Sequence, residues 1–162
     1  MAKVILICGK ICSGKSFYAR QLQRQHQAVI LSTDEATFDL IHNEQGESYV
    51  AFARRVNAYL QKKAAEIVHA GANVILDWGF WTRAERRAIT DYFLQRSVPC
   101  EWHYLDVTDD LWQRRIAERN RRVQSGCGGS DFYVDEGLLN KLLCTFEPPA
   151  ADEIDVWIDA HG

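Results

Sequence analysis

Apolar residues recur along the chain in short runs that have the length of β-strands. The runs lie at Val4–Cys8 and at residues 28–32, 73–77, 101–106 and 154–158. The first run is apolar at every position, which is typical of a parallel strand that is buried on both faces. The pattern therefore predicts a sheet of five strands.

Between these runs, apolar residues follow the three- to four-residue spacing of helices. This spacing predicts helices at residues 16–26, 49–70, 83–95, 110–123 and 135–144, and a short helix near residues 36–42. In the first helix, Phe17, Ala19 and Leu22 are expected to face the sheet. The last helix is expected to cover the core with four leucines: Leu138, Leu139, Leu142 and Leu143. Because strands and helices alternate throughout, the chain is expected to form a parallel, three-layer α/β sheet.

Capping residues mark several of the predicted helix ends. Thr82 and Glu85 have the spacing of a capping box, in which each side chain accepts a hydrogen bond from the other residue's backbone N–H. Ser48 suits the start of the helix at residues 49–70, and Gly71 suits its end. These residues support the predicted boundaries of the helix at residues 49–70 and the predicted start of the helix at residues 83–95.

A glycine-rich segment joins the first strand to the first helix. Its sequence, GKICSGKS at residues 9–16, matches G-x-x-x-x-G-K-S in the strand–loop–helix context that a phosphate-binding loop (P-loop) requires. The glycines let backbone N–H groups approach a polyphosphate, and the helix adds its positive end. Lys15 would neutralise phosphate oxygens, and the Ser16 hydroxyl would bind Mg²⁺. Nucleotide contacts are expected from the loop and the residue after it: Gly9, Lys10, Ile11, Cys12, Ser13, Gly14, Lys15, Ser16 and Phe17.

Composition and charge narrow the class of protein. The chain has 162 residues, of which 47% are hydrophobic, and this suits one well-cored domain over residues 1–162. A net charge of −3 argues against a general binder of nucleic acids or membrane surfaces. No apolar run approaches the roughly 20 residues that span a membrane, the N-terminus shows no signal-peptide cleavage site, and the five cysteines lack paired spacings. A cytoplasmic protein is expected.

Two of the predicted strands lead into aspartates. Asp34 follows the second strand, and Asp77 ends the third. Ligands of open α/β sheets bind at the carboxyl ends of the strands, so both carboxylates are expected to face one crevice. Asp34 is the first candidate for catalysis, and its alternative role is to cap the helix that follows it.

Aromatic and basic residues follow the third strand. Trp78, Phe80 and Trp81 follow the strand end, so they either form a wall of an acceptor pocket or pack in the core. Arg83 and Arg87 lie one turn apart in the next helix, and they either bind an anionic group of the acceptor or belong to a solvated basic face.

The helix at residues 110–123 holds the densest basic cluster. At about 100° per residue, Trp112, Ile116 and Val123 form an apolar stripe. Arg115, Arg119 and Arg122 lie at the edge of this stripe, whereas Arg114 and Arg121 point elsewhere. Arginines on one edge suit a clamp for phosphate oxygens, and a solvated arginine-rich helix is the alternative. With the glycine-rich loop at 124–130, this helix would form a lid over about residues 110–130.

Together these motifs resemble the small P-loop kinases grouped with the zeta toxins, chloramphenicol phosphotransferase, the bacteriophage-type polynucleotide 5′-kinase domain and gluconate kinase. The matching stretches are GKICSGKS, LSTD, LDWGFWTRAER, LWQRRIAERNRR and FEPPAADE, which cover most of the chain. GFWTRAER and FEPP are similar to uncharacterised, AAA-type ATP-binding proteins of this group. The resemblance implies a three-layer α/β/α P-loop NTPase fold with a five-stranded parallel sheet of order 2-3-1-4-5 and an arginine-rich lid helix.

The resemblance also implies an activity: ATP- and Mg²⁺-dependent transfer of the γ-phosphate to a hydroxyl group of a small acceptor. Asp34 corresponds to the acid that takes the hydroxyl proton in several relatives, and Lys15 to the phosphate-binding lysine. Arg119, with Arg115 or Arg122, corresponds to lid arginines that hold the γ-phosphate. Phosphoryl transfer needs these groups mainly for positioning and charge neutralisation.

Two further assignments come from the same resemblance. The loop at residues 146–149, including Pro148, lies where such kinases hold the adenine. Asp77 either holds Mg²⁺ through water, beside Ser16, or binds the substrate. A toxin role would bring an antitoxin partner.

Other functions are compatible with the sequence. One is a regulatory nucleotide-binding ATPase, and another is a nucleoside monophosphate kinase, which would use paired arginines for the acceptor phosphate. A GTPase is disfavoured because two leucines follow Asn140-Lys141, where the guanine-reading motif N-K-x-D requires an aspartate. Relatives phosphorylate antibiotics, sugars, nucleosides, nucleotide-sugars and polynucleotide ends, and the acidic balance makes a long nucleic acid the less attractive acceptor.

Overall fold

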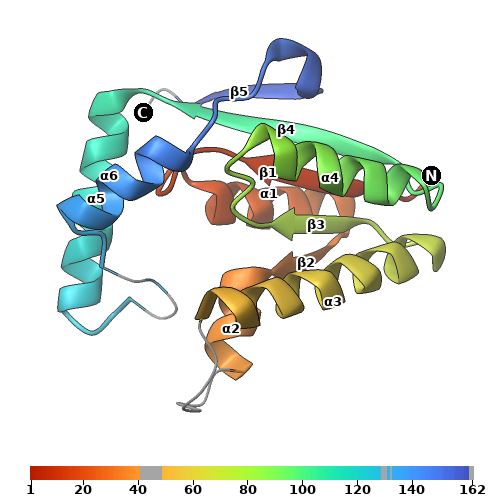
Figure 1. The fold of residues 1–162 in the computed structure, drawn as a ribbon, viewed down its shortest axis with the longest axis horizontal. Helices are drawn as coiled ribbons and strands as arrows, with labels where there is room; N and C mark the ends of the chain where they lie inside the picture. The colour runs from red at the N-terminus through yellow and green to blue at the C-terminus, as the bar shows by residue number, and fades with distance from the viewer. Residues whose placement is uncertain (41–48, 129–130, 132, 161–162) are drawn as a thin grey trace.

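The computed structural model describes residues 1–40, 49–128, 131 and 133–160, and it has a five-stranded parallel sheet covered by helices (Figure 1). The elements are β1 (Val4–Cys8), α1 (Lys15–His26), β2 (Val29–Ser32), α2 (Thr33–Leu40), α3 (Tyr49–His69), β3 (Val74–Asp77), α4 (Arg83–Leu94), β4 (Cys100–Val107), α5 (Asp109–Gln124), α6 (Glu136–Thr145), the 3₁₀ helix η1 (Ala151–Glu153) and β5 (Val156–Ala160). The strand order is β2-β3-β1-β4-β5, which confirms the predicted P-loop NTPase fold.

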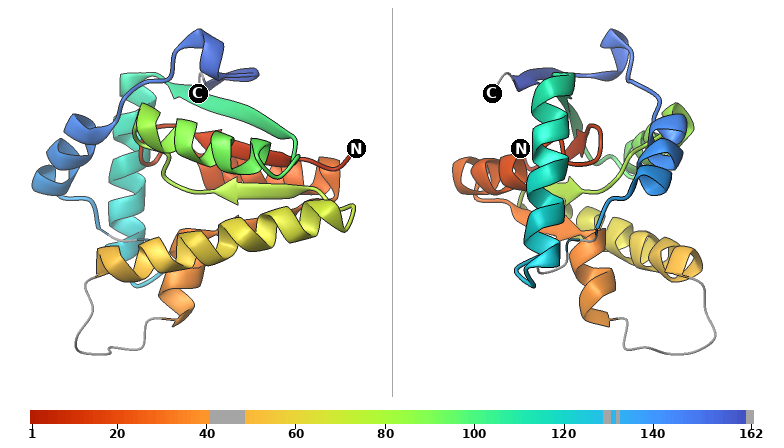
Figure 2. Two further views of the ribbon diagram at one scale, coloured as in Figure 1. Left: turned by 45° about the vertical axis from the view of Figure 1, so that its right-hand side comes forward. Right: turned by 90° about the vertical axis from the view of Figure 1, so that its left-hand side faces the viewer.

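The central strand β1 separates two helical layers. Val4, Leu6 and Cys8 pack with residues of α3 and α4, whereas Ile5 and Ile7 pack with α1. All five side chains are fully buried, which explains why this run has no polar position. The right-hand view of Figure 2 shows α1 on one side of the sheet and α3 and α4 on the other.

The helices α5 and α6 lie at the carboxyl ends of the strands (Figure 1). Trp112 and Ile116 of the predicted apolar stripe are buried against Ile11 and Val107. The indole Nε1 of Trp112 also donates to the carbonyl oxygen of Ile11 at 2.6 Å. These contacts attach α5 to the loop that follows β1.

Several helix boundaries differ from the predicted ones. The short helix α2 begins at Thr33 instead of residue 36, because the hydroxyl of Ser32 accepts a hydrogen bond from the Glu35 N–H at 3.3 Å and caps it. The capping box of α4 is confirmed by bonds in both directions between Thr82 and Glu85, at 3.1 and 2.9 Å. The last strand lies two residues later than predicted. The expected cap at Ser48, the end of the short helix at residues 41–42 and part of the glycine-rich loop, residues 129–130, lie outside the described residues.

Two expected core contacts are wrong. Phe17 is 68% exposed, whereas Ala19 and Leu22 are buried as predicted. Two residues correspond to about 200° of rotation along a helix, so Phe17 points away from the sheet when Ala19 faces it. In α6, Leu139 and Leu142 are partly buried against the cluster around Trp112, as predicted, but Leu143 is 39% exposed. This helix covers its neighbours only partly.

Across the described ranges, no helix combines the length and the apolar composition that crossing a membrane requires.

Phe93→Ala is expected to lower the free energy of unfolding by about 3–5 kcal/mol, because it leaves a cavity at a fully buried site between α4 and the sheet. Leu94→Ala is the matched control, since it removes a neighbouring side chain that is 71% exposed and should change stability by less than about 0.5 kcal/mol. Urea denaturation followed by circular dichroism measures both values. Equal losses in the two variants would contradict this packing of α4.

Candidate active site

The loop between β1 and α1 requires its two glycines. A Cβ atom on Gly9 would lie 2.8 Å from the Ser13 Oγ and 2.9 Å from the carbonyl oxygen of Leu105, so only glycine fits. Gly14 has a φ of +100°, a left-handed conformation that L side chains rarely adopt, and it precedes the first residue of α1. The loop therefore closes tightly over the carboxyl end of β1.

Within the described structure, the start of α1 has no side-chain cap and one buried hydroxyl of the loop has no hydrogen-bond partner. No side chain caps α1, and its first turn contains no acidic residue. The hydroxyl oxygen of Ser13 is fully buried and forms no hydrogen bond with the described atoms. Unsatisfied donors at a helix N-terminus are a suitable binding site for an anion. The loop thus fits a phosphate group.

Lys15 lies over this loop. Its Nζ donates to the carbonyl oxygens of Gly9 and Lys10 at 3.0 and 2.9 Å. Burial lowers the pKa of Lys15, and the negative charge of Asp77 is the strongest opposing influence. The ammonium group is therefore held between the loop and the acidic edge of the sheet.

The two predicted aspartates face the same cleft, which has a volume of about 1420 Å³. Asp77 is paired in register with Ser32 across β3 and β2, and Asp34 follows Ser32 by two residues in the first turn of α2. The capping alternative for Asp34 is wrong, because Ser32 provides that bond. Loss of hydration raises the pKa of Asp34, and the nearby charge of Asp77 raises it further.

The cations near Asp34 act in the opposite direction. Lys15 and Arg119 lower the pKa of Asp34, although the raising influences are larger overall. Asp34 therefore holds its proton more tightly than an ordinary aspartate. Such a group is a stronger base once it is ionised.

Two arginines of α5 contact the phosphate-binding loop. The guanidinium of Arg115 donates to the carbonyl oxygen of Ser13, and the Nη1 of Arg119 lies 3.6 Å from the Sγ of Cys12. Arg115 therefore helps to hold the loop, in addition to lining the cleft. Arg121 also lines the cleft, so the expectation that it points elsewhere is wrong.

Asp131 was not predicted from the sequence and pairs with two of the cleft arginines. Its carboxylate oxygens lie 3.4 Å from the Nη2 of Arg119 and 2.9 Å from the Nη2 of Arg122. It also raises the pKa of Asp34. An aspartate beyond the end of α5 carries no sequence signal of this role, because its position depends on how the chain returns from α5 toward α6.

The segment after β3 contributes two tryptophans to the cleft. Trp78 is 7% exposed, and its Nε1 donates to the carbonyl oxygen of Leu31 at 3.0 Å. Trp81 is half-buried and packs edge-on against Phe146, with a centroid distance of 6.1 Å. Both line the cleft, together with Gly79. The sequence pointed to both tryptophans, as well as to Phe80, as a wall of an acceptor pocket or as core residues.

Phe80 does not belong to the cleft. Its side chain is 5% exposed and packs in the core against Trp102, with a centroid distance of 4.9 Å. Trp81, the next residue along the chain, lines the cleft instead. Of the three aromatic residues after the strand end, Trp78 and Trp81 therefore line the cleft and Phe80 does not.

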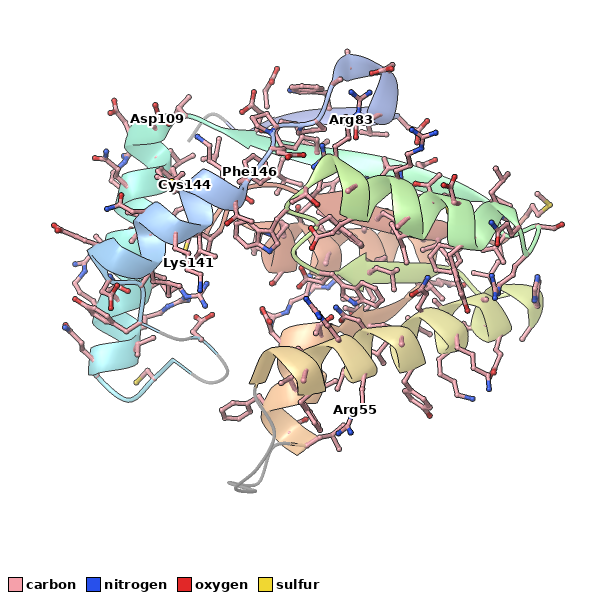
Figure 3. The ribbon with its side chains drawn as sticks, viewed as in Figure 1. Arg55, Arg83, Asp109, Lys141, Cys144 and Phe146 are labelled. Carbon is pink, nitrogen blue, oxygen red and sulfur yellow. The ribbon has the colours of Figure 1, made fainter. Side chains whose placement is uncertain are left out.

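Other predicted residues also lie away from the cleft. Arg83 is exposed and pairs with Glu153 at 3.5 Å, and Figure 3 shows it beside the η1 segment. Pro148 is exposed and does not line the cleft. The side chain of Lys10 points outward to Asp109 at 3.2 Å. Sequence position alone did not show on which side of its element Arg83 or Pro148 lies. A nucleotide contact through the backbone of Lys10 stays a prediction.

Apart from Gly9, which lies beside Ser13 and Leu105, the remaining predicted site residues come together at the cleft. Those that line the cleft are Ile11, Cys12, Ser13, Gly14, Lys15, Ser16, Phe17, Asp34, Asp77, Trp78, Arg115, Arg119 and Arg122. Within the described part of the chain, no cluster of three His, Cys, Asp or Glu residues is placed to hold a metal on its own. Ser16 and Asp77 both line the cleft, and an oxygen pair of this kind fits Mg²⁺ that shares its ligands with phosphate and water.

Solved structures with the same fold include several kinases. A putative kinase from Chloroflexus aurantiacus has a TM-score of 0.72 and 16% sequence identity, covering 98% of this chain and 88% of that chain. The APS kinase from Mycobacterium tuberculosis, solved with AMPPNP and APS, has a TM-score of 0.68 and 15% identity, with 98% and 88% covered. A sugar kinase from Janibacter sp. HTCC2649 has a TM-score of 0.65 and 17% identity, with 98% and 86% covered. At these identities the likeness is one of fold.

The sequence itself points to a family. No curated protein matches it at a significant level. Residues 4–149 match the AAA domain family, and this range contains the phosphate-binding loop, both strand-end aspartates and the arginines of α5. Because the match covers most of the 162 residues, the chain belongs to the AAA domain family.

Proposed function

We propose that this protein is a kinase that transfers the γ-phosphate of Mg-ATP to a hydroxyl group of a small acceptor. The observation that carries this proposal is that Lys15, Asp34 and Asp77 face one cleft and influence one another's charge. A lysine on the phosphate-binding loop, within electrostatic reach of a carboxylate that accepts a proton, supplies what phosphoryl transfer to an alcohol requires.

On the donor side, the loop and α5 would bind the triphosphate. The unpartnered N–H groups at the start of α1 and the ammonium of Lys15 would hold the β- and γ-phosphates. Arg119, with Arg122 and Arg115 beside it, would contact the γ-phosphate from α5. Ser16 and Asp77 would hold Mg²⁺, Asp77 through water, and the bound ion supplies neutralisation of charge on the phosphate oxygens.

On the acceptor side, Asp34 would act as the general base. As the acceptor oxygen bonds to the γ-phosphorus, its proton passes to the Asp34 carboxylate. The bond between this phosphorus and the oxygen bridging to the β-phosphate breaks, and ADP leaves with the bonding electrons. The raised pKa of Asp34 favours this role, because the carboxylate accepts a proton more readily than an ordinary aspartate does.

The structural neighbours support a kinase of this kind. One is a sugar kinase, and another is an APS kinase solved with AMPPNP and APS. The proposal includes membership of the small P-loop kinase group named above, a single domain over residues 1–162 with a lid near residues 110–130, and a cytoplasmic location. The proposal includes an antitoxin partner only if the protein acts as a toxin.

Lys15→Ala is expected to weaken the binding of Mg-ATP by about 10- to 100-fold, because a lost charge-assisted hydrogen bond costs roughly 1.5–3 kcal/mol. Lys10→Ala is the matched control on the same loop. Its ammonium pairs with Asp109 and lies over the Trp112 ring, so affinity should change by less than about twofold. Isothermal titration calorimetry with a non-hydrolysable ATP analogue measures both, and similar losses in the two variants would contradict this role of Lys15.

Asp34→Asn is expected to lower acceptor-dependent phosphate transfer by about 10²- to 10⁴-fold, because a general base is lost, with little change in the affinity for Mg-ATP. Transfer of labelled γ-phosphate to a panel of hydroxyl compounds measures the first effect. In a regulatory ATPase, the hydrolysis rate would respond neither to an acceptor nor to this substitution. Such indifference would remove the main support for a kinase.

The same substitution is expected to stabilise the fold at neutral pH. The folded protein holds the Asp34 proton more tightly than the unfolded chain does, so the stability gained from this group is present below the ordinary aspartate pKa and is lost as the pH rises through the raised value. The asparagine carries no charge and avoids this loss. Thermal unfolding should show a higher Tm for Asp34→Asn at pH 7 and a much smaller difference near pH 3, and a lower Tm at pH 7 would contradict the charge argument.

Asp131→Asn is expected to raise the affinity for ATP about two- to fivefold relative to ADP, because exposed ion pairs of this kind are worth about 0.2–1 kcal/mol. The Asp131 carboxylate pairs with Arg119 and Arg122, which the γ-phosphate would otherwise contact. Glu118→Gln removes one negative charge from the same cleft and leaves both pairs intact. Equal gains in the two variants, measured by calorimetry, would show a general charge effect instead of competition.

A further inference from the structure

The two sides of the cleft carry opposite charge. All cations that line it belong to α1 and α5: Lys15, Arg20, Arg115, Arg119, Arg121 and Arg122. The wall formed by the β2–α2 and β3–α4 junctions is defined here as the acceptor wall and consists of Asp34, Asp77, Trp78, Gly79 and Trp81. Among the described residues of this wall, two carry negative charge and none carries positive charge.

The arginines closest in sequence to the acceptor wall are engaged elsewhere. Arg83 pairs with Glu153, and Arg86 is 2% exposed and bonds to Glu153 and to the carbonyl oxygen of Glu147. Arg55 of α3 is exposed, lies over the Phe52 ring and does not line the cleft, and Figure 3 shows it at the outer surface.

The arginines of α5 that approach the wall are already balanced by charge. Asp131 pairs with both Arg119 and Arg122, and its carboxylate is close enough to Asp34 to raise the pKa of that residue. In the proposed reaction the γ-phosphate takes the place of this carboxylate. Both without ATP and with ATP bound, these arginines therefore pair with an anion on the donor side of the cleft.

Negative charge at the wall disfavours an anionic acceptor. Asp34 and Asp77 both lie on this wall. In the loaded protein Mg²⁺ would offset the charge of Asp77, but a phosphate or carboxylate on the acceptor would still face the Asp34 carboxylate. Among its described residues, the wall offers no arginine fork of the kind that normally binds such groups. An uncharged acceptor avoids this cost, and an amine would be attracted.

The tryptophans of the wall have fixed positions, and Trp81 is the more exposed of the two. The bond from Trp78 to the carbonyl oxygen of Leu31 fixes its indole. The indole of Trp81 folds over Gly79 so closely that a Cβ there would lie 2.1 Å from its Nε1. Aromatic faces bind the apolar faces of rings and attract ammonium groups.

We propose that the acceptor is an uncharged or amine-bearing ring compound whose hydroxyl faces Asp34 while its ring lies against Trp78 and Trp81. Sugars, amino sugars and nucleosides belong to this class, whereas sugar phosphates, sugar acids and nucleotides do not. This inference rests on the proposed kinase function and narrows its substrate. The transferred atoms are those given above: the acceptor oxygen gains the phosphoryl group, and its proton passes to Asp34.

The charge of the wall is tested without knowing the substrate. The fluorescence of Trp81 is obtained as the difference between the wild type and Trp81→Phe, and it is quenched in turn with caesium and iodide, normalised to N-acetyltryptophanamide. Caesium is expected to quench at least about threefold more effectively than iodide, because the local potential is negative. As a second arm, Asp77→Asn in the otherwise native protein should lower the caesium-to-iodide ratio. Preferential quenching by iodide, or no response to Asp77→Asn, would overturn the inference.

The acceptor class is tested with matched pairs that differ in one anionic group. Labelled phosphate transfer from Mg-ATP is compared for adenosine and AMP, for glucose and gluconate, and for glucosamine and glucosamine 6-phosphate. Faster transfer to the uncharged or amine-bearing member supports the inference, and Trp81→Ala should then raise the acceptor KM by about tenfold with the Kd of ATP unchanged. Transfer confined to the anionic members would overturn the acceptor class while leaving the kinase function intact. Failure of the wild type to bind Mg-ATP would refute the kinase function itself.

Discussion

The site depends on a single constraint, namely that the central strand of the sheet ends in a tight loop that leads into a helix without a capping side chain. Burial of β1 on both faces places its carboxyl end in the middle of the sheet edge. Gly9 lets the loop close against Ser13 and the Leu105 carbonyl, and α1 starts without a capping side chain. A turn that satisfied its own donors would be more stable alone but could not bind an anion.

Charges around this loop oppose one another. Asp34 and Asp77 are close enough to repel, and burial disfavours the charged form of Lys15. The lysine and Arg119 offset part of this cost, since each favours ionisation of Asp34. A fold selected only for stability would not place such groups together, so their convergence is the strongest structural sign that the cleft performs chemistry.

The helix α5 links the apolar core to the cleft. Trp112 and Ile116 attach it to the phosphate-binding loop, and Arg115 adds a bond to the Ser13 carbonyl. Arginines one and two turns farther along the helix are then placed over the cleft. Because the anchor contacts the same loop that would bind phosphate, the position of the arginines follows the position of the loop. The less buried α6 contributes Leu142 to this region.

The sequence by itself determined the order of the elements, the phosphate-binding loop and the strand-end position of Asp34 and Asp77. Each of these follows from local patterns, because apolar periodicity and glycine placement depend on neighbouring residues. The strand order came from the resemblance and was confirmed by the structure. Only the tertiary structure decided that Trp81 and not Phe80 faces the cleft, that Arg83 and Pro148 lie outside it, and that Asp131 pairs with the arginines of α5. These depend on how distant segments pack, and no pattern of neighbouring residues records that geometry.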